Sequence, residues 1–194
     1  MNAVPKTGHL KIELTIFVLL KGGGKMRSEW IPKGEMEHIL AALMPENRLA
    51  CEISLFTGLR INDVLALKTE QVRKQRFTVR EQKTGKTRTV RLPKELLDRA
   101  MACAGHFYVF EHRLNGREHR TRQAVYKDLK RAAAVFGCKA QVSPHSLRKV
   151  FAVEEFQSVG DLARIQKLLN HTSEAVTMLY AMANVVKRRK NFKG

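Results

Sequence analysis

Two residues of the stretch PHSLRKVF, His145 and Arg148, can act together on a phosphate group. They lie three positions apart in a predicted helix that starts near Pro144, so their side chains share one face. A planar guanidinium holds phosphate oxygens through forked hydrogen bonds, and an imidazole accepts or donates a proton near neutral pH. By itself this spacing is usual for a surface pair on a helix, so its meaning depends on the other motifs.

A second arginine, Arg60, closes the turn TGLR. Gly58 frees the backbone to place Arg60, and Asp63, one helical turn further on, can hold the arginine in position. Two arginines from separate motifs can clamp the non-bridging oxygens of one phosphate. They would supply the positive charge that a phosphoryl transition state needs.

A histidine and a tyrosine stand nine residues apart in NHTSEAVTMLY, residues 170–180. On one continuous helix they would face opposite ways. Both can serve one site if His171 precedes the helix, which Thr172 or Ser173 can cap, with Glu174 in the first turn. The hydroxyl of Tyr180 can then attack phosphorus and form a covalent ester.

Segments 76–82 and 87–93 alternate apolar and polar residues around KTGK. The pattern predicts a β-hairpin that turns near Gly85. A lysine on this hairpin can reach a leaving oxygen as an acid. The hairpin is also crowded with basic residues, which suits it to lie along the phosphate backbone of a nucleic acid. These residues are Arg80, Lys83, Lys86, Arg88 and Arg91.

The composition limits the classes of molecule that the chain is expected to bind. Its 194 residues include 36 lysines and arginines against 18 acidic residues, a formal net charge of +18. Such a surface favours nucleic acid, an anionic membrane or an acidic partner. The longest apolar run, residues 12–20, is too short to span a bilayer, and the GGGK after it is not a secretory cleavage site. Three scattered cysteines are expected to be free thiols in a reducing cytoplasm.

The elements that must position these residues are mainly helical. The period of the apolar residues predicts helices over 33–44, 46–56, 60–67, 94–103, 122–136, 145–157, 161–169 and the stretch 170–180. Thr121 is expected to cap the helix that Gly137 stops. The hairpin and a third short strand over 106–110 complete the predicted elements. No cluster of Asp, Glu and His offers a site for a metal pair, so arginine and lysine would carry the charge.

In order along the chain, TGLR, QKTGKTRTVRLP, HSLR, LLNH and the closing tyrosine resemble the catalytic domain of the tyrosine recombinases, the phage integrase family. Each motif is loose, but five in the right order are specific. The resemblance implies an α+β, mainly helical, DNA breaking–rejoining enzyme fold with a small three-stranded antiparallel sheet. It also implies a catalytic domain over residues 28–184, preceded by an extension or linker (1–27) and followed by a basic tail (185–194).

The resemblance assigns the proton transfers and the nucleophile by motif. In the family, DNA is cut through a 3′-phosphotyrosyl link and rejoined to a new partner. Tyr180 would be the nucleophile and His145 the base that takes its proton. Lys83, the first lysine of KTGKTR, would protonate the departing 5′ oxygen, although Lys86 is a near alternative.

The remaining site residues would act on the phosphate by charge and hydrogen bonding. The resemblance implies that Arg60 and Arg148 stabilise the pentacovalent transition state. His171 would donate a hydrogen bond to the phosphate, and Asp63 would support the site. Arg80, Lys86, Arg88 and Arg91 are expected to contact DNA.

The implied partners are double-stranded DNA, three further copies of the chain in a homotetramer, and accessory DNA-bending proteins, with no membrane. No cofactor is implied, neither metal nor ATP, because a phosphotyrosyl ester retains the energy of the diester. The expected location is the cytoplasm, in association with the nucleoid. The gene is expected to be bacterial or to be carried by a phage or plasmid. Two other functions stay open: a DNA-binding regulator with the same fold, and a type IB topoisomerase-like enzyme.

The sequence departs from the family pattern in two places. Asn170 stands where glycine usually precedes the histidine, a mild change because asparagine tolerates left-handed backbone. Residues 1–27 are too few for the separate DNA-clamping domain that usually comes first. We therefore expect either a member that consists of the catalytic domain alone or a piece of a longer protein.

Overall fold

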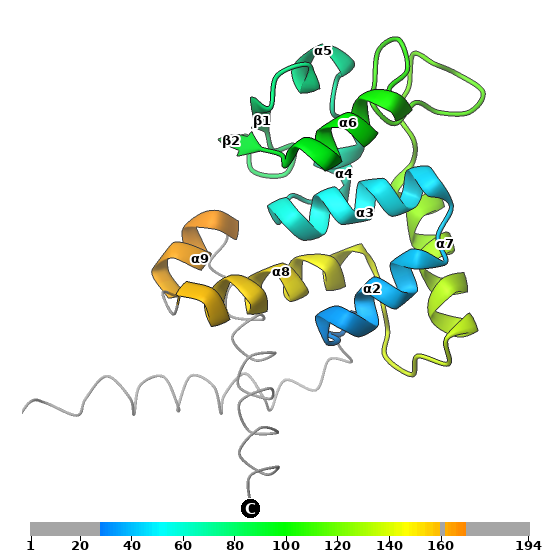
Figure 1. Cartoon of the computed structure of the whole chain (residues 1–194), viewed down its shortest axis with the longest axis vertical. Helices are drawn as coiled ribbons and strands as arrows, with labels where there is room; N and C mark the ends of the chain where they lie inside the picture. Colours follow the sequence, from blue (N-terminus) through cyan, green and yellow to red (C-terminus); the bar gives the residue numbers. More distant parts are fainter. Residues whose placement is uncertain (1–27, 160–161, 170–194) are drawn as a thin grey trace, which may run out of the picture.

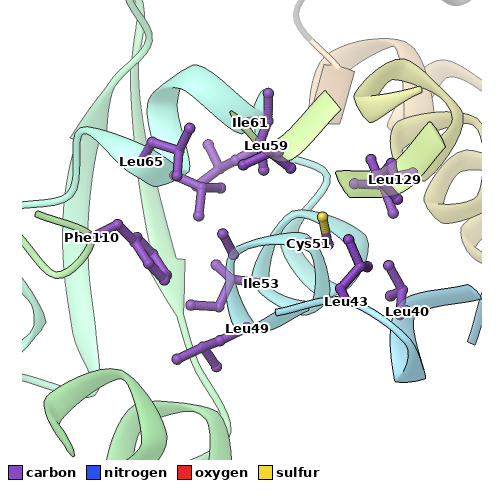
Figure 2. Close-up of a cluster of buried hydrophobic side chains, with 14 of the residues drawn as sticks. Leu40, Leu43, Leu49, Cys51, Ile53, Leu59, Ile61, Leu65, Phe110 and Leu129 are labelled. Atoms are coloured by element: carbon purple, nitrogen blue, oxygen red, sulfur yellow. The ribbon is translucent and has the colours of Figure 1, made fainter. Parts of the chain in front are cut away.

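A central helix, α3 (Pro45–Thr57), organises the computed structural model, which describes residues 28–159 and 162–169. Leu49, Cys51 and Ile53 of α3 are all buried, and Figure 2 shows them among apolar side chains from other parts of the chain. A helix that buries several faces must be surrounded by other elements. Those that pack against it are α2 (Lys33–Ala41), α4 (Ile61–Leu65), α6 (Lys94–Cys103), α7 (Arg122–Val135) and α8 (Pro144–Val159) (Figure 1).

Both ends of α3 are set by single residues. Pro45 begins the helix and disfavours helical backbone at Met44, so α2 ends at Ala41 rather than continuing to residue 44 as expected. Gly58 ends α3 with φ +66°, as the sequence predicted. A Cβ at Gly58 would also overlap the ring of Phe151 in α8, so both the backbone conformation and the available space disfavour a side chain here.

The predicted hairpin forms from β1 (Arg76–Arg80) and β2 (Thr87–Arg91), which pair antiparallel at the edge of the molecule (Figure 1). Gly85 supplies the turn with φ +67°, as expected. In the register, Phe77 lies opposite Val90, and Val79 lies opposite Arg88. The alternation therefore gives the hairpin a buried inner face and an exposed outer face.

The third strand predicted over residues 106–110 is wrong. Within the described residues the sheet has two strands, and this segment contributes only an isolated bridge between Tyr108 and Lys68. The backbone turns instead of extending, because Gly105 N donates to Tyr108 O and the Glu111 carboxylate accepts from Phe107 N at 2.7 Å. The segment is apolar because it forms a loop whose residues Val109 and Phe110 pack into the core.

The remaining helices mostly follow the predicted pattern. Helix α6 has the predicted limits, and α7 is capped by Thr121 Oγ1, which accepts from Ala124 N, and ends before Gly137. The short helix α5 (Thr69–Val72) was not predicted. After α8 comes α9 (Leu162–Leu169), and the helix predicted over residues 170–180 lies outside the described residues. None of the helices described is long and apolar enough to cross a bilayer.

A buried carboxylate ties α7 to the junction of α2 and α3. Asp128 Oδ2 accepts from Met44 N at 2.9 Å and from Asn47 Nδ2 at 2.7 Å. Its Oδ1 accepts from Arg131 Nη2 at 2.7 Å, and the same nitrogen donates to Ala42 O at 2.6 Å. Burial alone would raise the pKa of Asp128, but the hydrogen bonds from Asn47, Arg131 and Met44 outweigh it and lower the pKa.

Replacing Asp128 should therefore weaken the fold in a pH-dependent way. Because the folded-state pKa is lowered, the ionised carboxylate stabilises the fold above its unfolded pKa of about 3.9, and this contribution disappears as the pH falls through the folded pKa. Asp128→Ala should cost about 2–4 kcal/mol at pH 7, measured by urea denaturation. The difference between wild type and Asp128→Asn should shrink below about pH 4. If Asp128→Asn lowered the free energy of unfolding by the same amount at pH 7 and at pH 3, this account would be wrong. Asp98→Asn, at an exposed position, is the control.

Candidate active site

A cleft of about 410 Å³ gathers residues from separate parts of the chain. Four of the six predicted catalytic residues line it, namely Arg60, Lys83, His145 and Arg148. The other two, His171 and Tyr180, lie outside the described residues. The full lining is Arg60, Ile61, Asn62, Asp63, Gln82, Lys83, Arg122, Pro144, His145 and Arg148.

Arg60 is placed by the glycine that ends α3. Gly58 turns the chain, Leu59 anchors it in the core, and Arg60 becomes the N-cap residue of α4. The guanidinium is buried, and its Nη1 donates to Glu81 Oε2 at 2.5 Å. Glu81 follows β1 and is completely buried, so an ion pair whose carboxylate is shielded from water joins the first arginine to the hairpin.

Asp63 also holds the hairpin against α4. Its Oδ1 accepts from Gln82 N at 2.9 Å, directly before Lys83 in the chain. Burial raises the pKa of Asp63, although the hydrogen bond from Gln82 N and the charges of Arg60 and Arg148 act in the opposite direction. Asp63 was predicted to hold Arg60 and support the site, and the hydrogen bond that it makes is to the base of the hairpin turn.

The turn of the hairpin presents Lys83 to the cleft. Glu81 N donates to Lys86 O at 2.9 Å and Gly85 N donates to Glu81 O at 2.8 Å, which closes the turn. Lys83 lines the cleft, whereas Lys86 is exposed and is not among the lining residues. The geometry therefore favours Lys83 over Lys86 as the lysine of the site.

Arg148 enters the same cleft from α8. It is almost completely buried, between the core residues Leu147 and Val150. Its Nη1 donates to Gly58 O, and its Nη2 donates to Leu169 O at 3.2 Å. The second arginine is thus fixed to the glycine that positions the first one.

His145 lies one helical turn before Arg148 and is exposed at the cleft. The start of α8 is fixed by two serines: His145 N donates to Ser143 Oγ, and Ser143 N donates to Ser146 Oγ, each at 3.2 Å. An exposed imidazole on a fixed first turn, beside a buried arginine, suits a group that accepts a proton next to a bound phosphodiester.

The first turns of three helices line the cleft. They contribute Ile61–Asp63 of α4, Arg122 of α7, and Pro144 and His145 of α8. Helix N-termini carry partial positive charge and backbone N–H groups, so they favour anions. Arg122 was not predicted as a site residue. The sequence held only a weak signal for Arg122, namely a basic residue directly after a Thr cap, where the helix dipole disfavours positive charge.

The basic residues of the hairpin fall into two groups. Arg80, Lys86 and Arg91 are exposed, as a DNA-contacting surface requires. Arg88 lies on the inner face with Val90, and its guanidinium donates to Leu168 O at 2.6 Å and to Thr57 O. Desolvation by burial lowers the pKa of Arg88.

Glu81, which pairs with Arg60 behind the lining of the cleft, was not predicted either. The alternation of β1 indicates that Glu81 faces inward, because Phe77 and Val79 are buried and Glu81 is the next position on that face. The same rule places Arg88 on the inner face of β2 with Val90, whereas Arg88 was predicted to contact DNA.

The chain matches known proteins over most of its length. The model of the phage integrase family matches residues 29–186. The probable integrase/recombinase YoeC of Bacillus subtilis is 32% identical over 129 residues, which cover 64% of this chain and 70% of YoeC. Tyrosine recombinase XerA of Pyrococcus furiosus is 32% identical over 142 residues, which cover 69% of this chain and 49% of XerA.

Solved structures agree with the sequence matches on the fold. The XerH site-specific recombinase bound to palindromic difH substrate superposes with a TM-score of 0.68 at 20% identity, over 90% of this chain and 56% of that one. A lambda integrase (75–356) dimer bound to a COC′ core site gives a TM-score of 0.68 at 20% identity, over 89% of this chain and 70% of that one. The chain belongs to the phage integrase family and has the fold of a tyrosine recombinase catalytic domain.

The buried Arg60–Glu81 pair predicts a specific loss of stability. Glu81→Ala removes the carboxylate that pairs with Arg60 while the Arg60 charge stays buried. The free energy of unfolding should therefore fall by about 3–5 kcal/mol. Glu81→Gln should cost less, because the amide oxygen still accepts a hydrogen bond. Urea denaturation followed by circular dichroism measures both, with exposed Glu95→Gln in α6 as the control. A Glu81→Ala protein within about 0.5 kcal/mol of wild type would refute the role of the pair.

Proposed function

We propose that the chain is a site-specific DNA recombinase that cleaves and rejoins DNA through a 3′-phosphotyrosyl intermediate. The observation that carries this proposal is the convergence of Arg60, Lys83, His145 and Arg148 on one cleft. These residues come from α4, the hairpin turn and α8, so only the folded chain joins them. Two arginines, a lysine and a histidine around one cleft are groups that suit a phosphodiester.

In the proposed cleavage step, the Tyr180 oxygen forms a bond to phosphorus while the bond from phosphorus to the 5′ oxygen breaks. His145 takes the phenolic proton, and Lys83 gives a proton to the departing 5′ oxygen. The products are a tyrosine–3′-phosphate ester and a free 5′ hydroxyl, so no bond energy is lost to water. Rejoining reverses each step with a 5′ hydroxyl from another strand.

The transition state carries more negative charge on the phosphate oxygens than the ground state does. Arg60 and Arg148 are held rigidly by Glu81 and by main-chain carbonyls, so they need little reorganisation when this charge develops. The N-terminal turns of α4, α7 and α8 add to the positive field. His171 would contribute a further hydrogen bond to the phosphate.

Double-stranded DNA is the proposed substrate, and the exposed residues Arg80, Lys86 and Arg91 would contact its backbone beside the cleft. Arg122 would reach the phosphates nearest the cleft. The proposed catalytic domain covers residues 28–184, between a short extension (1–27) and a basic tail (185–194). A protein with this substrate acts where the DNA lies, at the nucleoid of a bacterial cell.

Recombination between two duplexes requires four strands to be cut. Each chain carries one predicted nucleophile, so we propose a homotetramer on paired sites, with accessory DNA-bending proteins where the sites must be brought together. A topoisomerase needs only one cut and would relax supercoiled DNA as a monomer. A regulator with this fold would bind DNA and make no covalent bond.

The covalent intermediate is the direct test. Duplexes nicked at successive positions, tiled across the DNA that flanks the gene, lose the short cleaved strand and trap the protein on DNA. We expect an adduct that survives SDS and that peptide mass spectrometry maps to Tyr180. Tyr180→Phe should bind the same duplex and form no adduct, because it lacks the attacking oxygen. An adduct that persists in Tyr180→Phe, or none on any duplex, would overturn the proposal.

The role of Lys83 can be separated from that of Lys86 by the leaving group. At the mapped cleavage site, sulfur replaces the 5′ oxygen, and a thiolate leaves without protonation because its pKa is about 8.5. Lys83→Ala should cleave the oxygen substrate about 10²–10⁴-fold more slowly than wild type and the sulfur substrate at nearly the wild-type rate. For Lys86→Ala, the ratio of the cleavage rates on the sulfur and oxygen substrates should be the same as for wild type. The reverse pattern would make Lys86 the acid.

A further inference from the structure

Two helix C-termini meet at a pair of arginines, one of which lines the cleft. Arg148 donates to Gly58 O and Leu169 O, and Arg88 donates to Thr57 O and Leu168 O. Each guanidinium thus bridges the end of α3 to the end of α9, and the two arginines use neighbouring carbonyls in both helices. One arginine belongs to the proposed phosphate site, whereas the other comes from the inner face of the hairpin.

The chemistry of helix ends explains why these contacts stabilise the arrangement. The last carbonyls of a helix have no partner within the helix and form the negative end of its dipole. A planar guanidinium with several fixed donors can hold two such carbonyls at a set separation, which a lysine ammonium cannot do as well. Arg88 therefore fixes the distance between the end of α3 and the end of α9.

Helix α9 depends on such ties. Its buried residues Ile165 and Leu169 pack with Phe151, Ala152 and Val153 of α8 in a small cluster apart from the main core. Figure 1 shows α9 at one end of the molecule, beyond the end of α8. Directly after Leu169 the chain continues to Asn170 and His171.

We propose that Arg88 is a positioning residue that clasps α9 to the end of α3, and so sets where the chain leaves α9 toward His171. In this role Arg88 does not contact DNA, unlike Arg80 and Arg91 on the outer face of the same hairpin. The catalytic consequence rests on the proposed function, but the clasp itself does not. Because Arg88 shares the hairpin with Glu81 and Lys83, one element would link the lysine, Arg60 and α9.

Amide hydrogen exchange tests the clasp without any reaction. In Arg88→Ala, the amides of Leu162–Leu169 should exchange about 10-fold faster or more, while those of α7 keep their wild-type protection. Arg91→Ala, from the outer face of the same strand, should leave the exchange of α9 unchanged. Arg88→Lys keeps the charge and loses the fork, so it should lie between wild type and Arg88→Ala. Unchanged exchange of α9 in both Arg88 variants would overturn the clasp.

Binding and cleavage separate positioning from DNA contact. On a duplex shown to be cleaved, Arg88→Ala should lower the rate of adduct formation at saturating DNA about 10–100-fold and keep the dissociation constant within about 2-fold. Its slope of log affinity against log salt should equal that of wild type, whereas Arg91→Ala should reduce the slope by about 0.9. Added guanidinium ion should partly restore the rate of Arg88→Ala.

The outcomes distinguish the two proposals. A reduced salt slope and a weaker dissociation constant in Arg88→Ala, with α9 unaffected, would make Arg88 a phosphate contact and overturn the clasp. Faster exchange of α9 in a protein whose wild type forms no adduct would support the clasp and reject the recombinase function. If Arg88→Ala does not fold, Arg88→Lys and its exchange profile decide the question alone.

Discussion

Buried positive charge is the constraint on which the structure of this site depends. Arg60 and Arg148 are both removed from water, and a buried cation is tolerated only where acceptors surround it. Arg60 donates to the Glu81 carboxylate, and Arg148 donates to two main-chain carbonyls. The burial fixes the arginines in place, so the cleft is formed before any ligand arrives.

These acceptors make the site a cooperative unit. Glu81 belongs to the hairpin, Gly58 to the end of α3 and Leu169 to the end of α9, so each arginine joins elements that are distant in the sequence. A displacement of the hairpin would disturb Arg60 through Glu81 and would move Lys83 with it. Gly58 belongs to this unit as well. A side chain at Gly58 would overlap the ring of Phe151 and would displace the carbonyl that Arg148 contacts.

The hairpin separates two uses of arginine by the alternation of its strands. On the inner face, Arg88 bonds to carbonyls within the chain. On the outer face, Arg80 and Arg91 are exposed and contribute to the large positive charge that suits the chain to a polyanion. Neighbouring residues of one strand can therefore serve internal order and external binding, because successive side chains point to opposite faces.

The sequence by itself determined the motifs, the hairpin with its turn at Gly85, the ends of α3 and α7 at Gly58 and Gly137, and the family to which the chain belongs. These features are local, since backbone freedom and side-chain period are properties of single residues and their near neighbours. Only the tertiary structure decided that residues 106–110 turn instead of forming a strand, that Glu81 pairs with Arg60, and that Arg88 faces inward to two carbonyls. Every residue carries the same carbonyl group, so the partner of a guanidinium is selected by how the helices pack and not by the letters of the sequence.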